Sequence, residues 1–135
     1  MNRRIIVVAS TIAIAAIVIS VTSDSSLDES IISQTIFIDA VYEPKNNIIR
    51  ITYNDNSEMT NIITLEILGM EKTFHKEFSQ NSFVETIQIN SEPKYGWSTM
   101  PVVFSVNHDE FGKIGLKTEI YQRDGLKPRI IYSES

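Results

Sequence analysis

Hydrophobic and polar residues alternate with a period of two along most of the chain after residue 34. Between residues 49 and 53, for example, Ile49, Ile51 and Tyr53 alternate with Arg50 and Thr52. This alternation is typical of β-strands that bury one face and expose the other. Short runs of Asn, Asp, Ser, Gly and Pro interrupt it repeatedly, and these residues favour turns. The pattern therefore predicts an antiparallel, all-β domain.

The predicted strands cover the ranges 35–42, 48–54, 61–68, 72–78, 83–89, 101–106 and 113–121, and a short run at 130–132 closes the chain. Their predicted inward-facing sets include Ile63, Leu65 and Ile67, then Val102, Phe104 and Val106, then Ile114, Leu116 and Ile120. Seven strands of this length and spacing predict an immunoglobulin-like sandwich. A jelly roll or a small open barrel needs a similar pattern, so both stay open as alternatives.

A different pattern occupies the N-terminus, where residues 5–21 carry no charge and follow Arg3 and Arg4. As a helix this segment is about 25 Å long, close to the lower limit for crossing a hydrocarbon core of about 30 Å. It is either a signal peptide cleaved near Ser23 or an uncleaved signal anchor. Its length exceeds the usual apolar stretch of a signal peptide, about 7 to 15 residues, and this favours the anchor.

The charges around this segment predict the side of the membrane on which the domain lies. Arg3 and Arg4 precede the apolar residues, whereas Asp24, Asp28 and Glu29 follow them. Basic residues favour the cytoplasmic side, so we expect the rest of the chain to lie outside the cytoplasmic membrane, anchored or secreted. The predicted organisation is a leader over 1–23, a polar spacer over 24–34 and a β-sandwich ectodomain over 35–135.

Composition excludes several classes of function. The chain has no cysteine, which excludes disulfides, thiolate metal sites and a cysteine nucleophile. Beyond the leader, ten Lys and Arg residues stand against 17 carboxylates, a formal charge of −7. This acidic balance argues against a nucleic-acid partner, whose phosphates need a basic surface.

The arrangement of an N-terminal apolar segment followed by one β-sandwich resembles membrane-anchored or secreted surface proteins with a single immunoglobulin-like or fibronectin-III-like domain. More distantly it resembles archaeal type IV pilin-like subunits, which join an apolar N-terminal helix to a β-sandwich. The resemblance covers the whole chain and concerns its layout alone. It therefore implies a surface location but assigns no functional residue.

Catalytic motifs are not found. His75 and His108 are the two histidines, and neither lies in a recognisable metal-ligand or nucleophile motif. We therefore predict no catalytic residue and no cofactor. Trp97, the single tryptophan, is expected to cap one end of the core, although an exposed aromatic contact is the alternative.

One group of polar residues has a spatial logic, because two predicted turns emerge at the same rim of an antiparallel sandwich. This predicted binding rim consists of Asp55, Asn56, Glu58, His108, Asp109 and Glu110. Loops at the ends of such sandwiches often carry recognition. The carboxylates of Asp55, Glu58, Asp109 and Glu110 are also candidate calcium ligands. Solvated turn residues without a binding role are the plainer interpretation.

Taken together, these features predict a non-catalytic surface or envelope protein that binds a protein or polymer or has a structural role. The first alternative is a pilus-type filament subunit, whose apolar N-terminal helix packs in a filament core. The second is a small exported enzyme or metal-binding domain.

Overall fold

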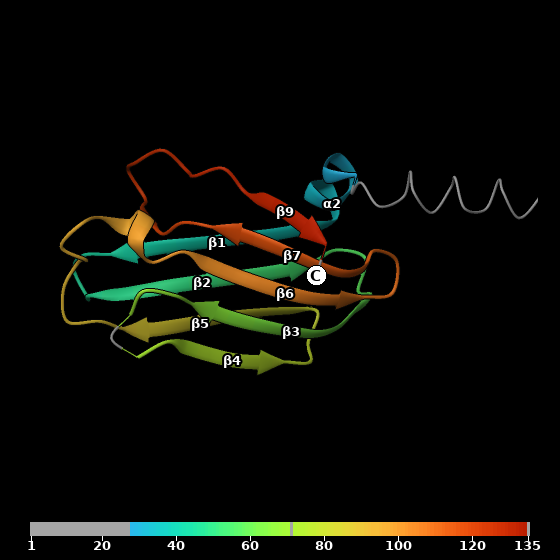
Figure 1. Cartoon of the computed structure of the whole chain (residues 1–135), viewed down its shortest axis with the longest axis horizontal. Coiled ribbons are helices and arrows are strands. Elements are labelled where there is room, and N and C mark those ends of the chain that lie inside the picture. The colour runs from blue at the N-terminus through green and yellow to red at the C-terminus, as the bar shows by residue number, and fades with distance from the viewer. Residues whose placement is uncertain (1–27, 71, 135) are drawn as a thin grey trace, which may run out of the picture.

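A computed structural model describes residues 28–70 and 72–134, and in these ranges the chain forms two β-sheets and one short helix (Figure 1). The first sheet has the order β5–β2–β1–β8, with the bounds Ser82–Gln88, Ile48–Asp55, Ile36–Glu43 and Tyr121–Gln122. The second has the order β4–β3–β6–β7–β9, with the bounds Phe74–Phe78, Thr60–Ile67, Val102–His108, Gly112–Thr118 and Ile131–Glu134. The predicted all-β fold is confirmed.

The core lies between the two sheets, where the alternating apolar residues of both meet. Ile49, Ile51 and Tyr53 of β2 are completely buried, as are Ile63, Leu65 and Ile67 of β3. The ring of Tyr53 lies 6.0 Å from the ring of Phe104 on β6, and this contact joins the sheets. Each predicted inward-facing set on β2, β3, β6 and β7 is thus buried, because period-two alternation sends alternate side chains to one face.

The C-terminal part of the chain differs from the prediction of one strand over 113–121. The structure ends β7 at Thr118 and begins β8 at Tyr121, which pairs in parallel with β1 of the other sheet. Ile120 lies between them and is buried in the core. The chain then returns to the second sheet, where β9 pairs with β7. Residues 28–70 and 72–134 therefore contain nine strands, two of them short edge strands.

A helix, α2 (Glu29–Thr35), overlaps the predicted polar spacer of residues 24–34 and includes Thr35, the first residue of the predicted strand 35–42. The side chain of Asp28 caps it by accepting a hydrogen bond from the backbone N–H of Ile31 at 3.2 Å. Ile32 is 1% exposed and belongs to the core. One buried residue in a helix of two turns leaves no periodic signal in the sequence, so pattern analysis missed it.

The predicted leader, residues 1–23, lies outside the described residues, as do residues 24–27 of the spacer. Across the ranges that are described, the structure contains no helix with the length and apolar character needed to cross a membrane.

The sandwich has two ends with different contents (Figure 1). The α2 end carries α2, the loop 55–59, the loop 79–81 and the turn 109–111. The opposite end carries the turn 44–47, the short helix η1 (Trp97–Thr99) and the turn 122–125. There Trp97 is half-buried, and its ring lies 4.8 Å from the ring of Tyr42, as expected of a cap over the core.

The core can be tested by truncating one of its largest buried side chains. We expect Phe104→Ala to lower the free energy of unfolding by about 3 to 5 kcal/mol, because Phe104 is completely buried between the sheets. Lys117→Ala is the control, since Lys117 is exposed, and it should change stability by less than about 0.5 kcal/mol. Denaturant unfolding followed by circular dichroism measures both. Equal losses would contradict the burial pattern.

Candidate functional site

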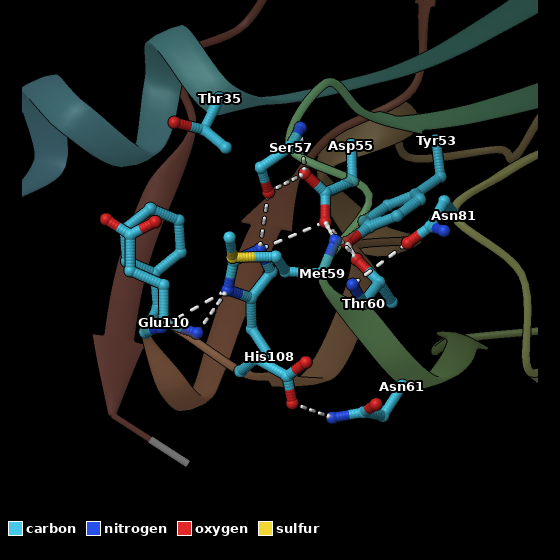
Figure 2. A network of polar contacts seen from close by, with 12 residues as sticks. Thr35, Tyr53, Asp55, Ser57, Met59, Thr60, Asn61, Asn81, His108 and Glu110 are labelled. Carbon is cyan, nitrogen blue, oxygen red and sulfur yellow. Dashed lines mark hydrogen bonds and ion pairs between the residues drawn. The ribbon is translucent and has the colours of Figure 1, made fainter.

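A buried polar network occupies the α2 end of the sandwich (Figure 2). At its centre the carboxylate oxygen Oδ2 of Asp55 lies 3.0 Å from Nε2 of His108, and both side chains are 0% exposed. Asp55 is the last residue of β2 and His108 is the last residue of β6. This contact therefore joins the two sheets at the point where both strands end.

The carboxylate of Asp55 accepts four hydrogen bonds and also contacts His108. Oδ1 accepts from the backbone N–H and the hydroxyl of Ser57, at 2.8 and 2.6 Å. Oδ2 accepts from the backbone N–H of Met59 and the hydroxyl of Thr60, at 3.1 and 2.6 Å, and it also contacts His108. Burial alone would raise the pKa of Asp55, but the bonds from Ser57, Thr60 and Met59 lower it below its usual value. The site is built for an ionised carboxylate.

The contacts of His108 fix its tautomer. Its Nδ1 accepts hydrogen bonds from the backbone N–H groups of Glu110 and Phe111, at 3.1 and 3.2 Å. A nitrogen that accepts two such bonds carries no proton, so the proton of the neutral ring is on Nε2. Nε2–H then faces the Ser57 hydroxyl oxygen at 3.2 Å and the carboxylate of Asp55 at 3.0 Å. His108 is therefore a neutral link between a backbone turn and a carboxylate.

A further hydroxyl chain leads from Asp55 into the core. The Thr60 hydroxyl donates to Asp55, so it accepts from the hydroxyl of Tyr53 at 2.7 Å. Burial raises the pKa of Tyr53, the negative charge of Asp55 adds to this, and the hydrogen bond with Thr60 acts in the opposite direction. The Tyr53 hydroxyl, the Thr60 hydroxyl and the Asp55 carboxylate thus each have a hydrogen-bond partner, as buried polar groups require.

Hydrogen bonds from backbone N–H groups connect the network to the surrounding segments. The N–H of Asn56 donates to the carbonyl of Thr35 at the end of α2, at 2.9 Å. The N–H of Asp109 donates to the carbonyl of Met59, also at 2.9 Å. The N–H of Thr60 donates to the side-chain oxygen of Asn81, at 2.9 Å. Four segments, α2 and the three loops of this end, are thereby held together.

The six residues of the predicted binding rim do lie at one end, but they divide into two groups. Asp55 and His108 are buried, so their prediction as exposed rim residues is corrected. Asn56, Glu58, Asp109 and Glu110 are exposed. The signal for this division was in the sequence, because Asp55 continues the inward alternation of Ile51 and Tyr53. His108 continues that of Phe104 and Val106 in the same way.

Ser57, His108 and Asp55 are in mutual contact, yet their arrangement differs from that of a catalytic triad. In a triad the serine and the aspartate bond to opposite nitrogens of the imidazole. Here Ser57 Oγ and Asp55 Oδ2 lie on the same nitrogen, Nε2, at 3.2 and 3.0 Å. The Ser57 hydroxyl donates to Asp55, and Nε2 already carries a proton, so His108 does not activate the hydroxyl.

The candidate metal ligands do not form a cluster. In the part of the chain that the structure describes, no group of three or more His, Asp or Glu residues is arranged to hold a metal ion. The carboxylate of Asp109 accepts a hydrogen bond from the side chain of Asn61 at 2.7 Å. His75 is exposed, as predicted, and its nearest carboxylate is that of Glu66 at 3.5 Å.

Comparison with family models and with curated proteins finds no match.

The importance of the network for stability can be tested at Asp55. We expect Asp55→Asn to lower the free energy of unfolding by about 3 kcal/mol or more, because an amide cannot accept all four hydrogen bonds and leaves the contact with His108 incomplete. Glu110→Gln is the control, since that side chain is exposed, and its effect should stay within about 0.5 kcal/mol. Chemical denaturation measures both variants. A near-neutral Asp55→Asn would show that the carboxylate is not structurally required.

The lowered pKa of Asp55 predicts how stability responds to strong acid. A carboxyl group whose pKa is lower in the folded protein than in the unfolded chain stabilises the fold at every pH above its unfolded-state pKa, which is near 3.9. This stabilisation is lost as the pH falls through the folded-state pKa. The melting temperature of the native protein should therefore fall below about pH 4. In Asp55→Asn, the melting temperature should decrease less over the same pH range, because the carboxyl group that takes up the proton is absent. The same acid dependence in both proteins would contradict the prediction.

Proposed function

We propose that this protein is a non-catalytic surface protein of the cell envelope, held at the cytoplasmic membrane by residues 5–21 with its β-domain outside. Its role is to bind a protein or polymer, or to take part in a surface structure. Release after cleavage near Ser23 is the variant of this proposal in which the leader is a signal peptide.

The topology supports an immunoglobulin-like classification of the sandwich. In immunoglobulin domains, strands A, B and E are neighbours in one sheet and C, F and G are neighbours in the other. Here β1, β2 and β5 are neighbours in one sheet, and β3, β6 and β7 are neighbours in the other. β4 lies beside β3, and β8 and β9 are additions after the seventh strand. This order favours the immunoglobulin-like alternative over a jelly roll.

The observation that carries the proposal is the short distance along the sequence between the apolar segment 5–21 and α2. α2 starts at Glu29, and only seven residues, 22–28, separate it from the apolar segment. Fully extended, seven residues span at most about 25 Å. A membrane anchor over 5–21 would therefore hold the α2 end of the sandwich next to the lipid surface.

The charges of the α2 end bear on this orientation. Exposed carboxylates gather there, namely Glu29, Glu58, Asp109, Glu110 and Glu134. Anionic lipid headgroups would repel them, so the covalent connection to residues 5–21, and not charge attraction, would keep this end beside the bilayer. In this orientation the exposed part of the predicted rim faces the membrane.

The opposite end is then the better contact surface for an external partner. Tyr95 is 78% exposed there, and tyrosine is enriched where proteins bind one another. An open pocket of about 600 Å³ lies between the turn 44–47 and the turn 122–125. Tyr42 and Pro44 form its apolar part, and Lys45, Arg123 and Asp124 supply charges of both signs. Such a mixed surface fits a protein or polymer with many polar groups.

Because the chain has no cysteine, single introduced cysteines test this orientation cleanly. In native membranes, a bulky maleimide should label Glu110→Cys several-fold more slowly than Tyr95→Cys, since the bilayer shields the α2 end. After detergent extraction the two rates should converge, because both positions are exposed. Equal rates in membranes would contradict the orientation.

Fractionation of the same membranes tests the anchor itself. Alkaline washing should leave the protein in the membrane pellet, and detergent should release it as a monomer or small complex. A particle that still sediments as a high-mass polymer in detergent would favour the filament-subunit alternative. Release by the alkaline wash would contradict the anchor.

A further inference from the structure

The turn 109–111 is held closed by a histidine rather than by the short side chains that usually cap such turns. Nδ1 of His108 accepts the N–H groups two and three residues further on, those of Glu110 and Phe111. Asn and Asp oxygens commonly make these bonds in Asx turns. Histidine differs from both because it takes up a proton near neutral pH.

A second proton on His108 has no place in the closed structure. Nε2 carries the first proton toward Asp55, so the second would go to Nδ1. There it would meet two N–H donors at 3.1 and 3.2 Å, which would lose their acceptor. Three N–H groups would then face one another with no acceptor between them, so proton uptake requires the turn to move away.

The charged groups near His108 act in the opposite direction. Asp55 faces it from the end of β2, and Glu58, Asp109 and Glu110 lie in the adjoining loop and turn. Tyr53 reaches the same carboxylate through Thr60 and is neutral. The carboxylates favour a cationic imidazole once the turn has moved, because Asp55 remains beside Nε2. Opening the turn and adding the proton are therefore coupled.

Opening releases the turn 109–111, together with the bond that the N–H of Asp109 makes to the carbonyl of Met59. The N–H of Asn56 still bonds to the carbonyl of Thr35 at the end of α2, because Asp55 continues to hold the loop 55–59. The centres of β6 and β7 are paired with each other through a continuous register from Val102–Thr118 to His108–Gly112. Loss of the last pairs leaves the rest of this ladder intact.

From this geometry we propose that the protonation state of His108 controls whether the turn 109–111 at the α2 end is closed or open. In the neutral form of His108, its Nδ1 closes the turn 109–111, and on protonation it releases this turn while Asp55 stays beside Nε2 and the two sheets stay packed. This pH-dependent opening does not depend on whether the chain is anchored or secreted. A domain outside the cytoplasm is exposed to the pH of its surroundings, so it could respond to changes in that pH.

Hydrogen exchange of the full chain in detergent micelles tests the proposal directly. As the pH falls from about 7.5 to 5, the protection factors of the Glu110 and Phe111 amides should fall, by up to tenfold per pH unit, as expected for uptake of one proton on opening. Those of Phe104 and Leu116, in the middle of β6 and β7, should stay constant over the same range. Constant protection at Glu110 and Phe111 down to about pH 5 would overturn the proposal.

Two histidine variants distinguish the effect of His108 protonation from that of other titrating groups. The chain has two histidines, so His75→Gln is the matched control, and the pH dependence at Glu110 and Phe111 should persist in it. In His108→Asn, the amide oxygen can accept the same two N–H groups, so protection there should no longer vary between about pH 7.5 and 5. An unchanged dependence in His108→Asn would exclude His108 as the responsible group.

A measurement on the unmodified protein covers the case in which His108→Asn does not fold. Nitrogen-15 chemical shifts of the His108 ring distinguish a protonated nitrogen from one that accepts hydrogen bonds. At about pH 7.5 we expect Nδ1 to be unprotonated and Nε2 to carry the proton. A proton on Nδ1 at that pH would remove the basis of the proposal.

Discussion

A buried carboxylate is stable only when donors surround it, and at Asp55 this requirement organises one whole end of the molecule. Its four donors come from the loop 55–59 and from the first residue of β3, and His108 at the end of β6 lies against the same carboxylate. The donors in the loop are in place only if the chain turns back tightly after β2. Glu58 accordingly adopts a positive φ of 57°, an uncommon conformation for a residue other than glycine. One ionised group thus fixes the path between the two sheets.

The alternation of apolar residues predicted the core well because a strand has only two faces. Ile51, Tyr53, Phe104 and Val106 were assigned inward, and all are buried. The same alternation, continued by one step, reaches Asp55 and His108. These two residues were assigned to an exposed rim because acidic and polar residues at strand ends are usually solvated. What the sequence cannot display is that the two strand ends lie face to face, so that each residue is the other's partner.

Two other features escaped prediction for a different reason, since they depend on contacts between distant segments. β8 consists of Tyr121 and Gln122 and gains its strand character from β1, about eighty residues earlier. A run of two residues has no period to detect. α2 is similar, because its single buried residue, Ile32, is defined by the core that it covers rather than by a helical stripe. In both cases tertiary packing determines the local structure.

The position of α2 connects the buried network mechanically to the N-terminal segment. Any force on the residues before Asp28 enters the domain through α2, which continues directly into β1. The carbonyl of Thr35, at the end of α2, accepts the N–H of Asn56, the residue next to Asp55. A pull on the N-terminal segment is therefore shared between β1 and the loop 55–59 rather than carried by α2 alone. Asp55 holds that loop through its hydrogen bonds with Ser57, Met59 and Thr60, so the buried carboxylate also secures the link between the loop and the N-terminal end of the domain.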